Sequence, residues 1–221
     1  RTARQAILKR LSSEIGETCN IALPDRDAMI YLERVETKWP LRIQLPVGSR
    51  VPFYCTSAGK IYLSSLDDKH LKGYLNAAEL TPHATNTMTT PEAVMAEVKR
   101  IRENGYSTDN EEFMDGMIAV AVPIRDAFGR LVSSLSFHAP LQRLSLEEAI
   151  GHVGLLNEAS AKLSALITGP AASGTARYYV VLAIVVVMTL LIKNVIRGRI
   201  GRQWMMIRDM DIAAELMGVR P

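Results

Sequence analysis

The chain has 221 residues, 48% of them hydrophobic and 22% charged, with a formal net charge of +3. This length is enough for one sizeable domain with its own core and an appendage. Seven Lys/Arg and three acidic residues follow Gly169, so the last part carries +4 and the preceding body −1. A slightly acidic body excludes a basic nucleic-acid-binding surface. Two cysteines, Cys19 and Cys55, exclude a disulfide framework and fit a reducing cytoplasm.

Helical spacing and strand alternation predict elements in the first half of the chain. No secretory signal opens the sequence, and because it does not begin with Met we expect its natural N-terminus to be missing. Asp67 or Ser65 is the expected cap of the third helix. The predicted elements are a helix over 3–15, strands over 18–23, 28–35 and 41–45, a loop over 48–52, and helices over 57–65 and 67–75.

The second half carries stronger boundary signals. Thr90-Pro91-Glu92 combines a cap, a proline at the first position and an acid in the first turn, and Asn104-Gly105 marks the end of that helix. Ser145-Leu146-Glu147-Glu148 forms a capping box. The predicted elements are a helix over 91–104, strands over 106–110, 117–125 and 131–137, and one long helix from 145 to about 166.

This order of elements predicts an α+β body with a largely antiparallel sheet covered by helices, and not a doubly wound parallel sheet. We expect the body to cover residues 1–168 and a small-residue linker to cover 169–175. A hydrophobic helix is then expected over 176–196, followed by a short amphipathic segment over 197–221.

Few residues suggest catalysis or metal binding. Gly59-Lys60 lacks the earlier glycine and the following Ser or Thr of a phosphate-binding loop. The four histidines and two cysteines show no metal-ligand spacing. Cys55 has no adjacent base in the sequence, so a small buried thiol is the better interpretation. We therefore expect no catalytic residue, no metal and no cofactor.

Two polar clusters leave alternatives open. Asp109-Asn110-Glu111-Glu112 follows a short strand, and such a cluster is most often a solvated turn; the alternative is that Asp109 points into a cavity and binds a ligand. Ser134, Ser136 and His138 share one face of the last strand because side chains alternate along it. This face suits either an exposed sheet surface or the floor of a polar pocket.

Residues 8–166 resemble the effector-binding domain of IclR-family transcriptional regulators. The motifs that carry the resemblance match the family in order and spacing. They are Gly16–Asn20, Tyr31–Glu36, Val47–Lys60, Ile101–Tyr106, Asp109–Glu112 and Val122–Asp126 leading to Gly129.

The resemblance implies a GAF-like domain with a curved antiparallel sheet that binds a small molecule, often an organic or aromatic acid. Some members of the family have a Cys where Ala119 stands and a second Ser where His138 stands. His138 could pair with a carboxylate, with a charge that depends on pH. The implied ligand-binding positions are Leu41, Ile43, Val51, Ser57, Ala58, Asp109, Ala119, Ser136 and His138.

The family's winged helix-turn-helix precedes this domain and is not found in this sequence, so we expect no operator binding by the chain itself. The resemblance further implies a cytoplasmic sensor that assembles into homo-oligomers through the effector domain. Effector identity and the direction of regulation stay open. An enzymatic function is disfavoured because the sequence shows no paired base and nucleophile.

The hydrophobic segment predicts a membrane helix. A span needs about 20 apolar residues, and 176–196 reaches this length if Lys193 extends its ammonium towards the interface. Residues 197–221 resemble the cytoplasmic coupling loop of a branched-chain amino acid ABC transporter permease, which contacts the ATPase subunit. An inner-membrane location of the tail follows, and a permease fragment with a soluble extension is the alternative function.

The two parts conflict in topology. Arginines cluster after the hydrophobic segment, and the positive-inside rule places them in the cytoplasm. The regulator-like body would then lie outside the cell, although its relatives sense cytoplasmic metabolites. Our hypothesis is that the chain joins fragments of two neighbouring genes. A full-length, membrane-inserted product in native cells would contradict it.

Overall fold

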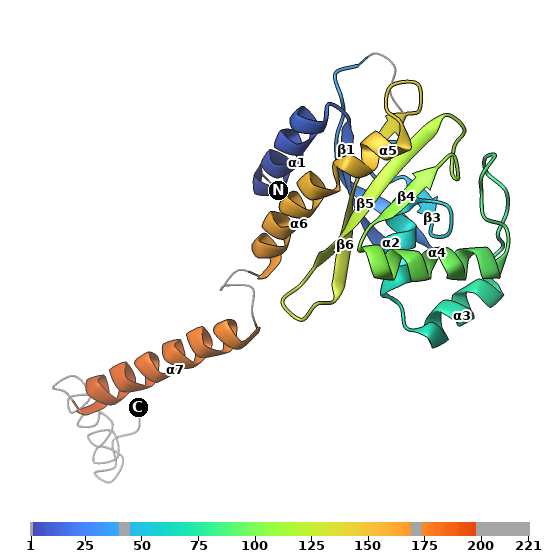
Figure 1. The fold of residues 1–221 in the computed structure, drawn as a ribbon. Helices are drawn as coiled ribbons and strands as arrows, with labels where there is room; N and C mark the ends of the chain where they lie inside the picture. The colour runs from blue at the N-terminus through green and yellow to red at the C-terminus, as the bar shows by residue number, and fades with distance from the viewer. Residues whose placement is uncertain (1, 40–44, 169–173, 198–221) are drawn as a thin grey trace, which may run out of the picture. The chain divides into compact units, whose positions relative to one another are not determined.

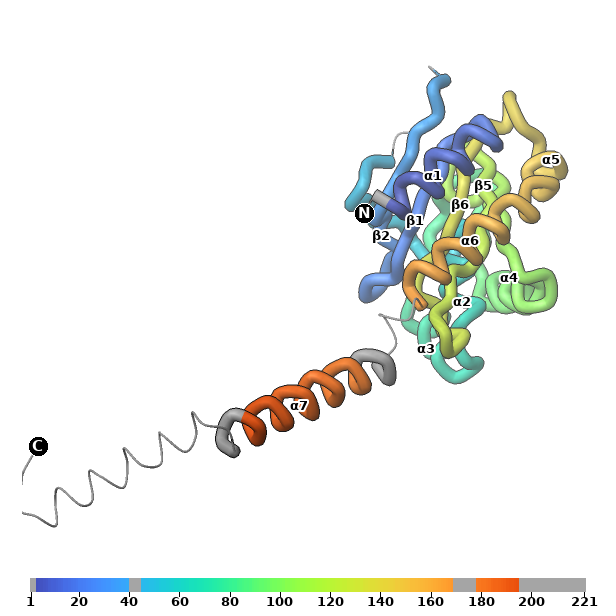
Figure 2. Tube along the Cα trace, turned by 90° about the vertical axis from the view of Figure 1, so that its left-hand side faces the viewer, coloured from blue at the N-terminus to red at the C-terminus, as the bar shows by residue number. Residues whose placement is uncertain are grey.

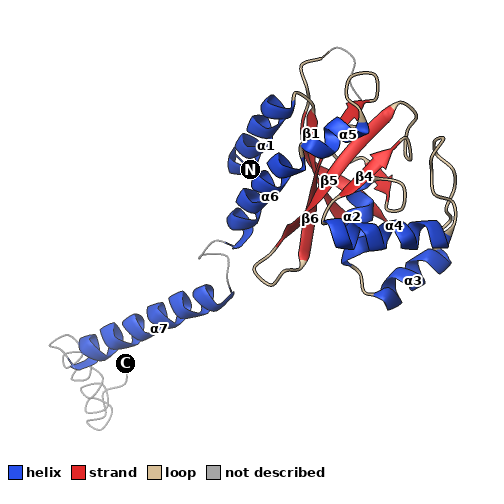
Figure 3. Ribbon diagram, in the orientation of Figure 1, coloured by secondary structure: helices blue, strands red, loops and turns tan. Residues whose placement is uncertain are grey.

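The computed structural model describes residues 2–39, 45–168 and 174–197, and the chain divides into two compact units, 1–168 and 169–221. The first unit is built on a six-stranded antiparallel sheet with the order β3-β2-β1-β6-β5-β4 (Figures 1 and 3). Its strands are β1 (Thr18–Asp25), β2 (Ala28–Val35), β3 (Arg50–Pro52), β4 (Ser107–Asn110), β5 (Met117–Arg125) and β6 (Leu131–Pro140). This curled sheet with flanking helices confirms the predicted α+β class.

Helices cover both faces of the sheet. Helices α1, α5 and α6 cover one face and α2 and α4 the other, and α1 and α6 lie side by side in both views (Figures 1 and 2). The helices of the first unit are α1 (Thr2–Ile15), α2 (Ser57–Ser65), α3 (Asp68–Ala77), α4 (Pro91–Asn104), α5 (Leu146–Gly151) and α6 (Val153–Thr168).

The two faces of the sheet differ in chemistry because side chains alternate along each strand. The face under α1 and α6 is apolar: Ile21, Val120 and Phe137 pack there against Leu11 and Leu163. Burial of these apolar side chains contributes to the hydrophobic stabilisation of the domain. The opposite face, under α2, carries polar residues in the middle of an otherwise apolar layer.

Local signals start and stop the helices as predicted. Asp67 caps α3 by accepting a hydrogen bond from the N–H of His70, and Thr90 caps α4 by accepting one from Ala93. Gly105 ends α4 in the left-handed conformation with φ 80°, which glycine adopts without strain. Ser145 and Glu148 form the capping box of α5.

Two predictions about elements are wrong. Residues 50–52, expected in a loop, form the edge strand β3, where Val51 pairs with Met29. Three residues are too few for a periodic signal, and proline is tolerated at a sheet edge. The single helix expected from 145 to 166 is two helices, α5 and α6, divided at His152. Gly151 and Gly154 flank this division, and glycine weakens a helix interior. The strand expected over 41–45 falls mostly on 40–44, outside the described residues.

The second unit contains α7 (Gly174–Arg197), whose apolar side chains from Tyr178 to Ile192 are 43–63% exposed. Among the described residues, no helix has both the length and the apolar content needed to cross a bilayer. The apolar stretch between Arg177 and Lys193 covers about 22 Å of helix at about 1.5 Å per residue, against about 30 Å of hydrocarbon. The prediction of a membrane span over 176–196 is corrected accordingly.

Candidate functional site

The strand register brings distant polar residues into two rows on the sheet face below α2. Asp109 on β4, Ala119 on β5 and His138 on β6 are successive partners in the first row. In the second row Ser136 of β6 pairs with Asn20 of β1. Both rows lie on one face because their members are two residues apart along each strand. Ser134, Ser136 and His138 are buried, so the interpretation as an exposed sheet surface is wrong.

Asp109 lies at one end of this face and is 1% exposed, so it is not part of a solvated turn. Its Oδ1 accepts hydrogen bonds from the N–H groups of Glu112 at 2.9 Å and Phe113 at 3.4 Å. Burial, and then the nearby Glu112 carboxylate, raise the pKa of Asp109 to about 7. The side chain therefore exchanges a proton near neutral pH.

A buried ion pair supports the loop that follows Asp109. The ammonium of Lys60, which is 0% exposed, donates to both carboxylate oxygens of Glu112 at 2.6 and 2.5 Å and to Glu97 at 3.3 Å. Burial raises the pKa of Glu112, against the attraction of the Lys60 ammonium. Lys60 therefore joins α2 and α4 to this loop, a structural role that replaces any phosphate-binding role of Gly59-Lys60.

His138 lies near the middle of the face and contacts Tyr31 of β2. The Tyr31 hydroxyl and His138 Nε2 are 3.3 Å apart, and the rings meet edge to face. Burial, and then the charge of Arg34, lower the pKa of His138 to about 3. The imidazole is therefore neutral at physiological pH in the unliganded domain.

Arg34 of β2 defines the other end of the face. Its Nη1 donates to Asn20 Oδ1 at 3.0 Å, and its side chain is 3% exposed. A bulge in the pairing of β1 with β2 at Ile21/Ala22 places both Tyr31 and Arg34 on this face. Strict alternation would have separated them, so sequence reasoning missed both, although they lie in the motif Tyr31–Glu36 that carries the resemblance.

The other predicted binding residues are distributed around this face. Val51 is buried on β3, and Ser57 and Ala58 are buried at the start of α2. Ser107 of β4 donates to the carbonyl of Ser57 at 2.5 Å, which fixes the start of α2 beside Asp109. Leu41 and Ile43 lie outside the described residues.

The described residues offer no set of three or more His, Cys, Asp or Glu side chains that could hold a metal ion. Burial raises the pKa of the Cys55 thiol to about 12, so this cysteine is protonated and a poor nucleophile. The described part of the chain thus presents a curled sheet with a buried polar face under α2.

The chain belongs to the family described as "Bacterial transcriptional regulator IclR C-terminal", whose model matches residues 1–165. It is 39% identical over 151 residues to the probable transcriptional regulator SauR of Cupriavidus necator, which covers 68% of this chain and 60% of that protein. It is 33% identical to the regulator KdgR of Escherichia coli, covering 72% of this chain and 60% of KdgR. These relatives are transcriptional regulators, not enzymes, and the chain spans about 60% of their length.

Solved structures show the same fold. The C-terminal domain of E. coli KdgR matches with a TM-score of 0.66 and 30% identity, covering 74% of this chain and 95% of that chain. Thermotoga maritima IclR matches with a TM-score of 0.70 and 31% identity, covering 74% of this chain and 66% of that chain. A double mutant of the inducer-binding domain of Acinetobacter PobR, in complex with 3-hydroxybenzoic acid, matches with a TM-score of 0.69 and 25% identity. The match covers 75% of this chain and 97% of that chain.

Proposed function

We propose that this domain binds a small-molecule effector on the polar sheet face and acts by binding, without catalysis. One observation carries the proposal. Asn20 Nδ2, Ser136 Oγ and His138 Nδ1 are buried polar atoms without a hydrogen-bond partner, and all three residues lie on this face. An unsatisfied buried polar group costs about 1–3 kcal/mol, so a cluster of them is best explained by a ligand that supplies the missing partners.

The proposed binding residues come from the two rows of the polar sheet face and from the apolar positions that the family resemblance implies. Asp109, Ser136 and His138 would orient the ligand, and Val51, Ala58 and Ala119 would form apolar walls. Leu41 and Ile43 remain proposed walls on the basis of the family resemblance alone. We further propose an organic acid as ligand, since a double mutant of the PobR inducer-binding domain, which is similar in structure, forms a complex with 3-hydroxybenzoic acid.

The activity of the whole regulator is a further proposal. A winged helix-turn-helix would bind the operator, and the effector would shift the arrangement of subunits in a homo-oligomer, so that ligand binding and DNA binding are coupled. Such a regulator acts in the cytoplasm, where the DNA is. The membership in a family of transcriptional regulators supports this proposal.

The permease interpretation of the tail has less support. The described part of 176–221 contains no helix suited to a bilayer, and residues 198–221 lie outside the described residues. The coupling-loop resemblance, its ATPase partner and the joining of two genes therefore stay predictions from the sequence. Nothing in the sensor proposal depends on them.

A thermal-shift screen of the full chain against small aliphatic acids, aromatic acids and amino acids tests the sensor proposal. We expect a saturable rise in Tm with at least one compound. Ser136→Ala should abolish the shift because it removes an unpartnered hydroxyl of the site. Ser13→Ala, on the exposed side of α1, is the matched control and should keep the shift. A folded chain that responds to no compound would contradict the proposal for these ligand classes.

A further inference from the structure

Tyr31 and His138 form a buried pair on the polar face. The Tyr31 hydroxyl lies 3.3 Å from His138 Nε2, and the two rings meet edge to face with their centroids 5.7 Å apart. Both side chains are buried, so water has little access to this contact. The pair joins β2 to β6, which are separated by β1 in the sheet. The two side chains therefore hold each other in place across β1.

Both partners of this contact are uncharged. Burial raises the pKa of the Tyr31 hydroxyl above its usual range and lowers the pKa of His138 to about 3. A neutral imidazole has one nitrogen that donates a hydrogen bond and one that accepts, and the bond made by one nitrogen decides the role of the other. The contact therefore has two possible directions, each with its own tautomer of His138.

The two directions leave different polar atoms without a partner. If Tyr31 donates to Nε2, the imidazole proton lies on Nδ1, and this N–H group is the only buried donor of the pair that lacks a partner among the described residues. If Nε2 donates to Tyr31 instead, the phenol proton and the Nδ1 acceptor both lack a partner among the same residues. A buried polar group without a partner is costly. The first direction is therefore favoured, with Tyr31 as donor and the proton of His138 on Nδ1.

A donor at His138 Nδ1 matches its neighbours on the face. Asn20 Nδ2, which can only donate, is buried without a partner. The Ser136 hydroxyl also lacks a partner, and a hydroxyl donates as well as accepts. Ser136 pairs with Asn20 across β6 and β1 and stands two residues before His138 on the same face of β6. All three groups can donate, so a ligand group whose oxygens only accept, such as a carboxylate, satisfies them.

We propose that Tyr31 is a positioning residue of the effector site: its hydroxyl holds His138 as a hydrogen-bond donor, and the site thereby selects an effector with an acceptor-only oxygen group. Neither the family resemblance nor the comparisons assign this role to Tyr31. The inference rests on the proposed sensor function and deepens it, because it gives the selectivity of the same site. Without the Tyr31 hydroxyl, Nε2 would lose its donor and the two tautomers of His138 would mix.

NMR spectroscopy of the histidine ring nitrogens in the full, unliganded chain tests the role of Tyr31. The wild-type chain should show a protonated Nδ1 and an unprotonated Nε2 for His138, whose signals are identified by comparison with His138→Gln. Tyr31→Phe removes only the hydroxyl and should shift the proton towards Nε2. Tyr62→Phe is the matched control and should keep the wild-type tautomer: its ring packs against Phe53, and within the described part of the chain its hydroxyl has no hydrogen bond. A merely structural effect of Tyr31→Phe would lower the Tm without moving this proton.

Isothermal titration calorimetry of the full chain with matched acids and amides tests the selectivity. The pairs are benzoate and benzamide, 3-hydroxybenzoate and 3-hydroxybenzamide, and lactate and lactamide, in which an amino group that donates replaces an oxygen that accepts. The wild-type chain should prefer at least one acid to its amide. Tyr31→Phe should reduce this preference by about 2- to 10-fold, the equivalent of one neutral hydrogen bond, and Tyr62→Phe should leave it unchanged. Because the variants carry the same charge, the charge difference between acid and amide cancels in this comparison.

The outcomes separate the two proposals. A proton on Nε2 of His138 in the wild-type chain, or a tautomer that Tyr31→Phe leaves unchanged, would overturn the role of Tyr31 and keep the sensor. An unchanged preference for the acid in Tyr31→Phe would overturn the selectivity and keep the sensor as well. Absence of binding by every probe to a folded wild-type chain would overturn the selectivity together with the proposed class of effector.

Discussion

Lys60 shows at the scale of a single residue how this domain holds a charge in its interior. Its ammonium has no exposed surface and lies between Glu112 and Glu97. Removing one member of a buried ion pair leaves the other charge uncompensated, whereas apolar replacement of both members is often neutral. The pair therefore ties α2, α4 and the loop after β4 into one unit.

Lys60→Met is expected to lower the free energy of unfolding by about 3–5 kcal/mol, because Glu112 stays buried without its cation. The double variant Lys60→Met/Glu112→Leu should regain a large part of this loss. Urea unfolding of the two variants and the wild type measures the difference. A Lys60→Met chain as stable as the wild type would show that the pair contributes nothing. Lys162→Met, in an exposed pair with Glu158, is the matched control and should change little.

Asp109 gives the stability of the domain a dependence on pH. Its pKa is about 7 in the folded chain, whereas an ordinary, solvent-exposed aspartate side chain has a pKa of 3.8. Between these values the folded state binds more protons than the unfolded state, so stability falls as pH rises, by up to about 1.4 kcal/mol per pH unit. Asp109→Asn should remove this decline. Unfolding measured from pH 5 to pH 8 tests it, with Asp27→Asn, an exposed carboxylate, as control. An unchanged decline in Asp109→Asn would assign it to another group.

At the scale of elements, the contact between α2 and the segment before it depends on Gly59. A Cβ at this position would collide with the backbone of Phe53, which cannot move aside as the end of a side chain can. Thr56 caps the same helix through a hydrogen bond from the Gly59 N–H. The close approach places the start of α2 against the sheet face that holds Asp109.

Gly59→Ala is expected to be severely destabilising or to prevent folding, since backbone must shift to admit one methyl group. Gly73→Ala is the matched control. Nothing lies within 4 Å of its added Cβ, and alanine favours a helix interior over glycine by about 1 kcal/mol, so Gly73→Ala should be neutral or stabilising. Thermal unfolding of both variants decides the matter. Similar Tm values for Gly59→Ala and the wild type would refute the close approach.

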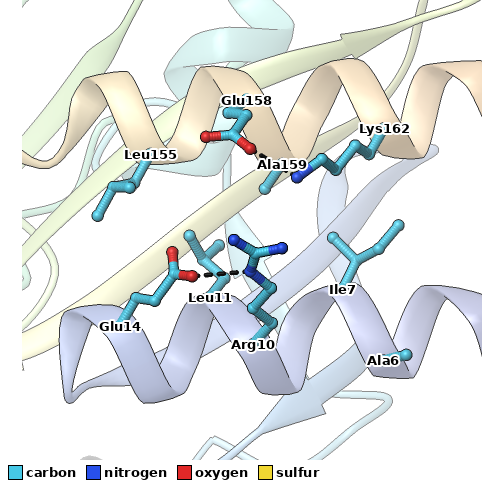
Figure 4. Close-up of a pocket in the computed structure, with 9 residues that line it drawn as sticks. All are labelled: Ala6, Ile7, Arg10, Leu11, Glu14, Leu155, Glu158, Ala159 and Lys162. Atoms are coloured by element: carbon cyan, nitrogen blue, oxygen red, sulfur yellow. Dashed lines mark hydrogen bonds and ion pairs between the residues drawn. The ribbon is translucent and has the colours of Figure 1, made fainter.

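At the scale of the whole molecule, the apolar core of the sensor body draws its described members from residues before 169, such as Leu8, Phe137 and Leu163. The groove between α1 and α6, about 270 Å³, lies within the same body (Figure 4). The ion pairs of Arg10 with Glu14 and of Glu158 with Lys162 line it. The described core and this groove are formed by residues before 169, without a contribution from residues 169–221.

A chain cut after Thr168 should therefore unfold in one cooperative transition, within a few degrees of the Tm of the same body in the full chain. Circular dichroism on heating measures both. Failure of the shortened chain to fold would mean that α7 contributes to the core of the body. The same chain should retain the ligand-dependent rise in Tm proposed for the sensor.

The limits of sequence reasoning are visible in particular residues. Thr90, Gly105 and Ser145 act on backbone groups within a few positions, so their roles as helix boundaries could be predicted. The edge strand around Val51 could not, because its pairing with Met29 comes from a distant segment. The assignment of Asp109 and Ser136 as binding residues came from the family resemblance and stays a proposal.

The sequence by itself determined the class of fold, most helix boundaries and the family motifs, since all of these depend on the order and local spacing of residues. Only the tertiary structure decided which polar residues share the buried face. The bulge between β1 and β2 turns Tyr31 and Arg34 to the same side, and burial beside Arg34 keeps His138 neutral. Register and burial are properties of the assembled sheet, so no single segment of the chain encodes them.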